Sequence, residues 1–176
     1  MPEFVERPMR PALFLDRDGV LNIDHGYVSR WEDFAWVDGA REVVAAFNRA
    51  GWWVFVVTNQ SGIGRGYYTE DDMHALHARM GEDLARDGAR IDAFYWCPHH
   101  PDAAEARYRH PDPPDRKPNP GMLLRAMAEW PVDRAASLMI GDKAGDMQAA
   151  AAAGVQGVLF EGGDLRVFLK AQGLLP

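Results

Sequence analysis

Two aspartates, Asp16 and Asp18, stand two residues apart directly after the first strongly apolar stretch of the chain, residues 12–15. Residues two apart in a strand point the same way, so both carboxylates leave the strand end together. Like charges that close repel each other unless a cation or a proton lies between them. Gly19 follows and lets the chain turn sharply away. The pattern indicates a magnesium site in which one carboxylate attacks a substrate and the other shuttles a proton.

Further reactive side chains follow other apolar runs. Thr58 and Asn59 come at the end of the second run, Lys117 lies in the long loop after the third, and Asp142 and Asp146 follow the fourth. In parallel sheets ligands bind beyond the carboxyl ends of the strands. We therefore expect these side chains to converge on one rim of a sheet.

The elements that must position these residues alternate between strand and helix along the chain. This alternation predicts an α/β fold, a Rossmann-like doubly wound parallel sheet with helices on both faces. We expect strands at 12–16, 52–58, 91–96, 137–140 and 155–160, and helices at 39–50, from 69 to 88, from 119, at 146–153 and from about 164. Residues 20–37 are predicted to form a hairpin flap. Residues 97–117 hold five prolines and no periodicity, which predicts a long functional loop.

Size and composition are those of one ordinary domain spanning residues 1–176, with 47% hydrophobic and 26% charged residues. The net charge of −7 argues against a surface that binds nucleic-acid backbones. Cys97 is the single cysteine, which rules out an internal disulfide and favours a reducing compartment. No apolar run approaches the roughly 20 residues of a membrane span. We expect a cytoplasmic monomer that acts on a small molecule and binds neither nucleic acid nor membrane.

Taken together, the rim residues are those of a phosphoryl-transfer site. Asp16 is the candidate nucleophile and would form an aspartyl-phosphate. Asp18 would protonate the leaving alcohol and then take a proton from the hydrolytic water. Thr58 and Asn59 can donate hydrogen bonds to phosphoryl oxygens, and Lys117 supplies positive charge against them.

The predicted cofactor is Mg²⁺, which prefers oxygen ligands. Asp16 and Asp142 can supply two carboxylates, and the backbone carbonyl of Asp18 a third ligand. We expect Asp146 to act as an acid in the first turn of a helix rather than as a metal ligand.

Four of these features resemble the motifs of the haloacid-dehalogenase-like hydrolases. They are Asp-Arg-Asp-Gly-Val at 16–20, the threonine at 58, the lysine at 117 before a proline, and Gly-Asp-Lys-x-x-Asp at 141–146. The second aspartate is similar to the phosphatase branch of that superfamily. The segments before Thr58 and Lys117 are too short for a folded insert, so the resemblance implies a member without a separate cap domain.

A narrower resemblance covers nearly the whole chain. Segments 22–28, 58–63, 97–101, 116–118 and 141–143 are similar to those of D-glycero-D-manno-heptose 1,7-bisphosphate 7-phosphatases. This implies removal of the 7-phosphate during synthesis of the heptose precursors of lipopolysaccharide or related glycans. The residues expected to contact substrate are Asp24, His25, Gly26, Tyr27, Asn59, Gln60, Ser61, Arg116 and Lys143.

One segment departs from that family, which usually closes its long loop with zinc through Cys-x-His and a later Cys-x-Cys. Cys97 and His99 are present, but Pro113 and Asp115 occupy the later positions, and proline cannot ligate a metal through its side chain. Cys97 and His99 with Asp115 or His110 offer a substitute set for Zn²⁺. Without zinc, the prolines must stiffen the loop instead.

Several other functions share some of these features. Histidinol-phosphate phosphatases and other small-molecule phosphatases have similar motifs, and the flap residues 24–27 favour the heptose substrate over them. A nucleic-acid 3′-phosphatase would need a basic stripe that the chain lacks. A non-catalytic phospho-receiver would not need an acid at Asp18, because its phosphoryl group must persist. A purely structural, partner-binding domain would leave the polar groups at four strand ends unexplained.

Overall fold

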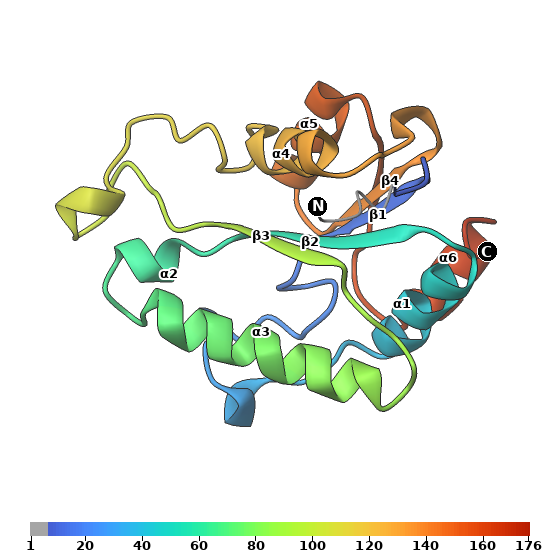
Figure 1. Ribbon diagram of the computed structural model, residues 1–176. Coiled ribbons are helices and arrows are strands. Elements are labelled where there is room, and N and C mark those ends of the chain that lie inside the picture. The colour runs from blue at the N-terminus through green and yellow to red at the C-terminus, as the bar shows by residue number, and fades with distance from the viewer. Residues whose placement is uncertain (1–6) are drawn as a thin grey trace, which may run out of the picture.

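The computed structural model describes residues 7–176 and is built around a parallel sheet of five strands (Figure 1). The strand order is β3-β2-β1-β4-β5, and every neighbouring pair is parallel. The strands are β1 (Ala12–Leu15), β2 (Trp53–Asn59), β3 (Ala93–Cys97), β4 (Leu138–Gly141) and β5 (Gln156–Leu159). The predicted fold class is confirmed. The first six residues of the predicted domain lie outside the described residues.

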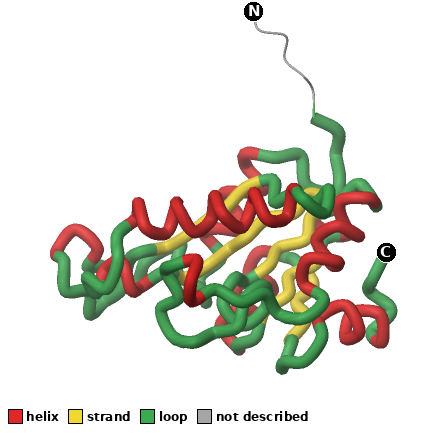
Figure 2. The backbone as a smooth tube through the Cα atoms, turned by 90° about the horizontal axis from the view of Figure 1, so that it is seen from below, coloured by secondary structure: helices red, strands yellow, loops and turns green. Residues whose placement is uncertain are grey.

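Helices cover both faces of the sheet. Helices α1, α3 and α6 pack on one face and α4 and α5 on the other (Figure 1). Figure 2 shows the same sheet from below, on the side of α1, α3 and α6. The helices are α1 (Ala40–Arg49), α2 (Ser61–Gly64), α3 (Glu70–Ala85), α4 (Gly121–Glu129), α5 (Ala144–Ala153) and α6 (Leu165–Ala171), with 3-10 turns η1 (Trp31–Asp33), η2 (Ala106–Tyr108) and η3 (Arg134–Ala136).

Strand β1 lies at the centre and joins the two cores. Leu13 and Leu15 pack with α1, α3 and α6, whereas Ala12 and Phe14 pack with α4 and α5. All four side chains are fully buried, because successive strand residues point to opposite faces and both faces are covered. This explains the unbroken apolar run in the sequence, and it fixes the end of β1 in the middle of the sheet's rim.

One helix was not predicted, and two others begin two residues away from the predicted start. Helix α2 was not predicted, and it follows β2 directly. Helix α4 begins at Gly121, two residues later than expected, because the Asn119 side chain donates to Asp112 and to the Pro113 carbonyl instead of capping the helix. Helix α5 begins at Ala144, two residues before the predicted start.

The flap and the long loop flank the carboxyl ends of the strands. The base of the flap is a hairpin, as predicted, with hydrogen bonds from Ile23 to Ala35 and from Val37 to Leu21. The loop at 97–117 contains η2 and has its own small core, in which Ala103 and Tyr108 pack against residues of α2 and α3. Within residues 7–176, no helix is long and apolar enough to cross a membrane.

Candidate active site

The first site residues follow β1. The Asp16 backbone N–H donates to Ile140 of β4, 3.0 Å away, which continues the parallel ladder one residue beyond the strand. Gly19 then has a φ of +90°, and a Cβ at this position would overlap the Asp142 carboxylate. The glycine is therefore required both by the backbone conformation and by the close approach of a second acid.

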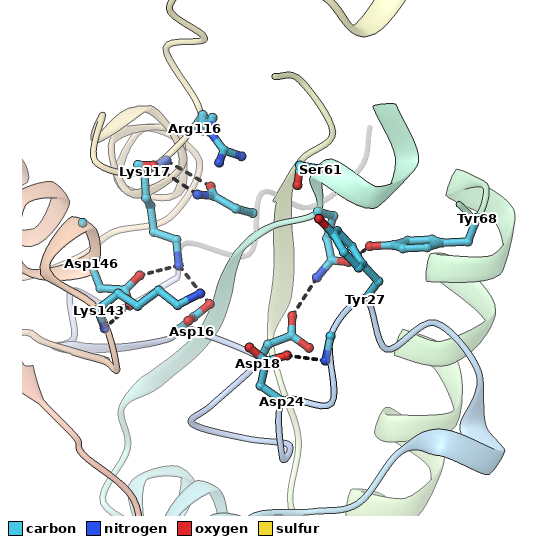
Figure 3. Close-up of a pocket in the computed structure, with 14 residues that line it drawn as sticks. Asp16, Asp18, Asp24, Tyr27, Ser61, Tyr68, Arg116, Lys117, Lys143 and Asp146 are labelled. Atoms are coloured by element: carbon cyan, nitrogen blue, oxygen red, sulfur yellow. Dashed lines mark hydrogen bonds and ion pairs between the residues drawn. The ribbon is translucent and has the colours of Figure 1, made fainter. Parts of the chain in front are cut away.

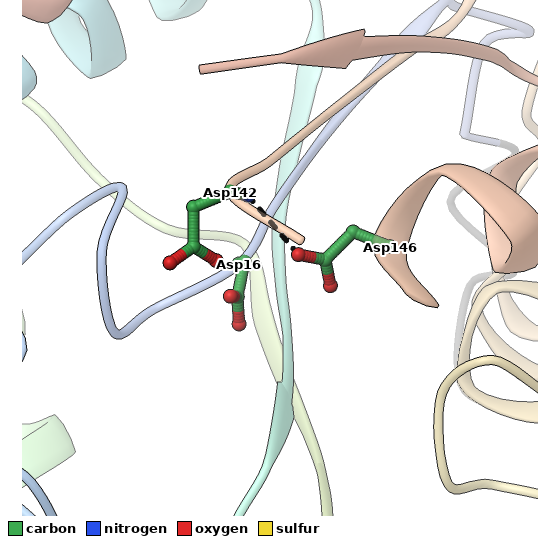
Figure 4. Close-up of side chains that lie close together, drawn as sticks. All are labelled: Asp16, Asp142 and Asp146. Carbon is green, nitrogen blue, oxygen red and sulfur yellow. Dashed lines mark hydrogen bonds between the residues drawn. The ribbon is translucent and has the colours of Figure 1, made fainter. Parts of the chain in front are cut away.

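Three carboxylates meet where β1 and β4 end. Oxygen atoms of Asp16, Asp142 and Asp146 lie within 4.8 Å of one another (Figure 4). Burial, opposed by Lys117 and reinforced by Asp146, raises the pKa of Asp16 to about 8. Burial likewise raises the pKa of Asp142, whose Oδ1 is buried without a hydrogen-bond partner in the described chain. An orphaned carboxylate oxygen beside other acids suits a hard divalent cation, so these residues fit Mg²⁺.

Lys117 supplies a positive charge at the same point. Its Nζ lies 2.9 Å from Asp16 Oδ1 and 2.6 Å from Asp146 Oδ1 (Figure 3). Burial lowers the pKa of Lys117, but the two carboxylates more than offset this, so the pKa is raised and the ammonium keeps its charge. Asn59 fixes the lysine's backbone, with Nδ2 donating to the Lys117 carbonyl and Oδ1 accepting from its N–H, both at 3.0 Å.

Asp146 has two roles in this arrangement. Its Oδ2 accepts from the backbone N–H groups of Asp142 and Lys143, each at 3.1 Å, at the start of α5. The prediction of a helix N-terminal acid is confirmed. The other oxygen lies 2.6 Å from Lys117 Nζ, and the side chain joins the acidic cluster on the predicted rim, although Asp146 was not predicted as a metal ligand. Gly141 makes this possible, because a Cβ there would overlap the Asp146 side chain.

Asp18 lies in a different setting from Asp16. Its Oδ1 accepts from Arg17 Nη2 at 3.0 Å and from Asn22 Nδ2 at 3.1 Å. Its Oδ2 accepts from Gln60 Nε2 at 3.1 Å. Asp18 therefore faces donors, whereas Asp16 shares its surroundings with acids and a lysine.

These groups line a cavity of about 380 Å³ between the flap, α2 and the start of α5 (Figure 3). Its walls are formed by Asp16, Asp18, Asp24, Gly26, Tyr27, Asn59, Gln60, Ser61, Tyr68, Arg116, Lys117, Lys143, Gly145 and Asp146. Most of the predicted catalytic and substrate residues are thus brought together. Tyr68 and Gly145 were not predicted.

Two predicted site residues lie elsewhere. Thr58 is fully buried below the cavity, where its hydroxyl accepts from Gln60 Nε2 at 2.8 Å. His25 lines a separate hollow on the flap, together with Glu32 and Phe34. The flap's left-handed turn at Gly26 and Tyr27 separates His25 from the main cavity wall.

The cavity wall also carries a cationic side chain outside the acidic cluster. Arg116 lies on its wall, half-buried, and burial lowers the pKa of its guanidinium. Its Nη1 is buried and has no hydrogen-bond partner among residues 7–176. A guanidinium with one buried and unpaired N–H group is suited to an anionic ligand.

The long loop does not gather its candidate zinc ligands. In the described part of the chain, no three of Cys97, His99, His110 and Asp115 bring ligand atoms within 4.8 Å of one another. Cys97 is buried, and burial raises the pKa of its thiol. Asp115 instead pairs with Arg125 at 3.1 Å.

Comparisons with known proteins identify the class to which this fold belongs. The HAD-hydrolase-like family matches residues 115–167, which contain Lys117, Asp142 and Asp146. A crystal structure from Mesorhizobium loti, described as a putative HAD-like phosphatase, has a TM-score of 0.83 and 43% identity and covers 89% of this chain and 75% of that one. The sheet and its acidic rim are those of a HAD-like hydrolase.

Curated relatives narrow the class. The D-glycero-beta-D-manno-heptose-1,7-bisphosphate 7-phosphatase of Rhodopseudomonas palustris is 48% identical over 167 residues, which cover 93% of this chain and 90% of the relative. The D-glycero-alpha-D-manno-heptose-1,7-bisphosphate 7-phosphatase of Burkholderia mallei is 50% identical over 144 residues, which cover 82% of this chain and 76% of the relative. A D,D-heptose 1,7-bisphosphate phosphatase from B. bronchiseptica, complexed with magnesium and phosphate, has a TM-score of 0.76 and 35% identity over 94% of this chain and 88% of that one. The chain belongs to the heptose 1,7-bisphosphate 7-phosphatase family, as its motifs predict.

Proposed function

We propose that this phosphatase removes the 7-phosphate of D-glycero-D-manno-heptose 1,7-bisphosphate through an aspartyl-phosphate at Asp16. The observation that carries the proposal is the position of the Asp16 carboxylate. It lies at the rim of the sheet, 2.9 Å from the Lys117 ammonium and close to two further acids, and it opens on a cavity whose wall includes Arg116. The names of relatives that are similar over most of the chain support the heptose substrate.

The reaction proceeds in two steps. In the first, an Asp16 oxygen forms a bond to phosphorus, the bond from phosphorus to the sugar oxygen breaks, and Asp18 gives its proton to that oxygen. In the second, Asp18 takes a proton from water, the water oxygen bonds to phosphorus, and the acyl-phosphate bond breaks. Inorganic phosphate leaves and both aspartates return to their starting states.

The acidic cluster is where the cofactor would be held. Asp16 and Asp142, with the Asp18 backbone carbonyl, would bind Mg²⁺. When bound, the ion neutralises the carboxylates and polarises the phosphoryl group. Lys117 holds the Asp16 carboxylate in place at 2.9 Å and offers its charge to the phosphoryl oxygens.

The rest of the substrate would extend from this rim along the cavity. We propose that Arg116 and Lys143 bind its anionic groups, and that Asp24 to Tyr27 of the flap, with Ser61, contact the sugar. The burial of Thr58 argues for support of the site from below rather than for contact with the phosphoryl group. In this proposal, residues 1–176 act as one domain, with the flap at 20–37 and the loop at 97–117 as two walls of the site.

A phosphate-release panel with Mg²⁺ tests the substrate. It compares the alpha and beta anomers of the heptose 1,7-bisphosphate with histidinol phosphate and a 3′-phosphorylated oligonucleotide. We expect one or both heptose anomers to give a kcat/KM at least tenfold above the other two compounds. Preference for histidinol phosphate would replace the heptose assignment. Release from none of the four would contradict the phosphatase mechanism.

Metal removal tests the cofactor. We expect EDTA to abolish phosphate release and Mg²⁺ to restore it. We expect metal analysis of the purified protein to find no stoichiometric zinc, because Asp115 is paired with Arg125 and the loop gathers no zinc set in the described residues. Zinc at one equivalent per chain would contradict this expectation.

We also propose that the enzyme works as a cytoplasmic monomer. The single, buried and unpaired cysteine is consistent with a reducing compartment. Size-exclusion chromatography with light scattering is expected to give a mass near 19.7 kDa, and a dimer mass would contradict the monomer.

A further inference from the structure

We propose that Gln60 and Tyr68 form a positioning pair that aims the Asp18 carboxyl at the leaving oxygen of the substrate. This inference rests on the proposed function, in which Asp18 is the general acid. It assigns Gln60 a role different from the substrate contact expected from the sequence, and it gives a role to Tyr68, which no motif indicated.

The hydrogen bonds of the Gln60 amide determine which way this side chain is turned. Gln60 Nε2 donates to Asp18 Oδ2, 3.1 Å away, and a carboxyl oxygen can accept this hydrogen bond both before and after Asp18 gives up its proton. The same Nε2 lies 2.8 Å from Thr58 Oγ1, which occupies the second amide hydrogen. The amide oxygen then faces Tyr68, whose hydroxyl donates to it. Each donor and acceptor of the Gln60 amide thus has a partner that fixes its orientation.

Burial makes this arrangement rigid. Gln60 is 2% exposed and Tyr68 8% exposed, so protein groups supply the hydrogen-bond partners of the Gln60 amide. Burial also raises the pKa of the Tyr68 hydroxyl, which keeps it a donor. A buried amide that lost this hydroxyl would have an unsatisfied oxygen and would be free to rotate away from Asp18.

The local sequence places the Tyr68 ring. Thr69 caps α3, with its hydroxyl accepting from the Asp72 N–H and Asp72 accepting from the Thr69 N–H, and this box fixes the residue before it. The ring packs with Ile63 of α2 and Met73 of α3. Tyr68 therefore extends from the start of α3 to the edge of the cavity, as Figure 3 shows, and its hydroxyl reaches Gln60 there.

The consequence for catalysis depends on the leaving group. A sugar alkoxide is a strong base and needs the Asp18 proton when the bond to phosphorus breaks. Nitrophenolate is a weak base and leaves without one. Substitution of a residue that only positions Asp18 will therefore lower kcat/KM much more for the sugar phosphate than for an aryl phosphate. A residue that merely stabilises the fold will affect both alike.

The experiment measures kcat/KM of Tyr68→Phe with the heptose bisphosphate and with p-nitrophenyl phosphate, both with Mg²⁺. We expect the ratio of the two values, sugar over aryl, to fall by about 10- to 100-fold, the scale of losing the alignment of a general acid. Gln60→Met, which keeps the chain length and removes the amide, is expected to lower the ratio at least as far.

Tyr108→Phe is the matched control. Tyr108 packs in the same small core as Tyr68, but its hydroxyl donates to Glu70, 3.1 Å away, outside the cavity. We expect this variant to keep the wild-type ratio. An equal loss on both substrates in Tyr68→Phe, or a loss on neither, would overturn the positioning role. Failure of the wild-type enzyme to hydrolyse either compound would instead overturn the proposed function.

Discussion

The two aspartates that open the site differ in what surrounds them. Asp16 lies with Asp142, Asp146 and Lys117, so its charge is balanced within a shared cluster. Asp18 accepts hydrogen bonds on both oxygens and has no acid among its hydrogen-bond partners in the described residues. The pair of environments matches two separate roles, attack on phosphorus and proton transfer.

Amide substitutions separate these roles. We expect Asp16→Asn to abolish phosphate release, because an amide cannot form the acyl-phosphate. Asp18→Asn keeps the size of the side chain, removes the proton transfer and replaces one accepting oxygen with an amide nitrogen, so we expect the rate to fall by about 10²- to 10⁴-fold. Both are measured as phosphate release from the heptose bisphosphate. Full activity in Asp16→Asn would end the covalent mechanism.

Some of these residues could be found from the sequence and others could not. Asp16, Asp142 and Lys117 were predicted because each follows an apolar run, and parallel strands gather such positions on one rim. Tyr68 follows no strand, and its contact with Gln60 depends on how the start of α3 packs. Side-chain packing of this kind leaves no local pattern, so no sequence rule pointed to it.

At the scale of elements, the turn after β1 joins the backbone to the metal site. Gly19 has a φ of +90° and leaves no room for a Cβ beside Asp142. Gly51, which follows α1, has a similar φ of +84° but open space around it. The two glycines share the conformational demand and differ only in the neighbouring acid, so they form a natural pair for comparison.

We expect Gly19→Ala to raise the Mg²⁺ concentration for half-maximal activity at least tenfold, because the new methyl group must displace the Asp142 carboxylate. Gly51→Ala is expected to cost roughly 1–2 kcal/mol of unfolding free energy from left-handed backbone strain and to leave the Mg²⁺ requirement as it is. Mg²⁺ titrations of phosphate release and urea unfolding curves measure the two effects. Equal Mg²⁺ requirements in both variants would show that the turn does not set the cation site.

The elements themselves were predicted to different degrees. The buried strands and α3 carry strong signals, an apolar run in β1 and a cap with a helical stripe in α3. Helix α2 has only four residues, Ser-Gly-Ile-Gly, and two of them are glycines. Helix propensity alone would therefore predict a turn here. It forms because Gly62 and Gly64 allow Tyr68 and the long loop to approach closely. Tertiary packing decided its structure.

At the scale of the whole molecule, one buried histidine connects the turn that follows β1 with the hydrophobic core. His77 of α3 is 5% exposed and stacks on Phe94 of β3, with ring centroids 4.4 Å apart. Its Nε2 lies 3.2 Å from Arg17 Nη1. Arginine can only donate, so this nitrogen accepts and the ring is neutral in the folded protein. Arg17 in turn donates to Asp18 and to the Val28 carbonyl at the base of the flap.

This contact predicts how stability depends on pH. Burial, reinforced by Arg17, lowers the pKa of His77 from 6.5 to about 3 in the folded protein. The unfolded chain therefore binds a proton below pH 6.5 that the folded protein does not, and stability falls as the pH drops. We expect His77 to remove about 2 kcal/mol of unfolding free energy between pH 7 and pH 5.

Urea unfolding at pH 7, 6 and 5 checks this, with wild type compared with His77→Gln, whose amide oxygen can still accept from Arg17. The variant is expected to lose less unfolding free energy on acidification, so that the difference in stability between the two proteins narrows or reverses toward pH 5.

The raised pKa of Asp16 acts in the opposite direction, because the folded protein binds this proton more tightly than the unfolded chain and gains stability as the pH falls. This contribution is common to both proteins and cancels in the comparison. His25→Gln, which removes an exposed histidine of the flap, should follow the wild-type curve. Parallel curves for wild type and His77→Gln would mean that His77 is not held neutral by its burial against Arg17.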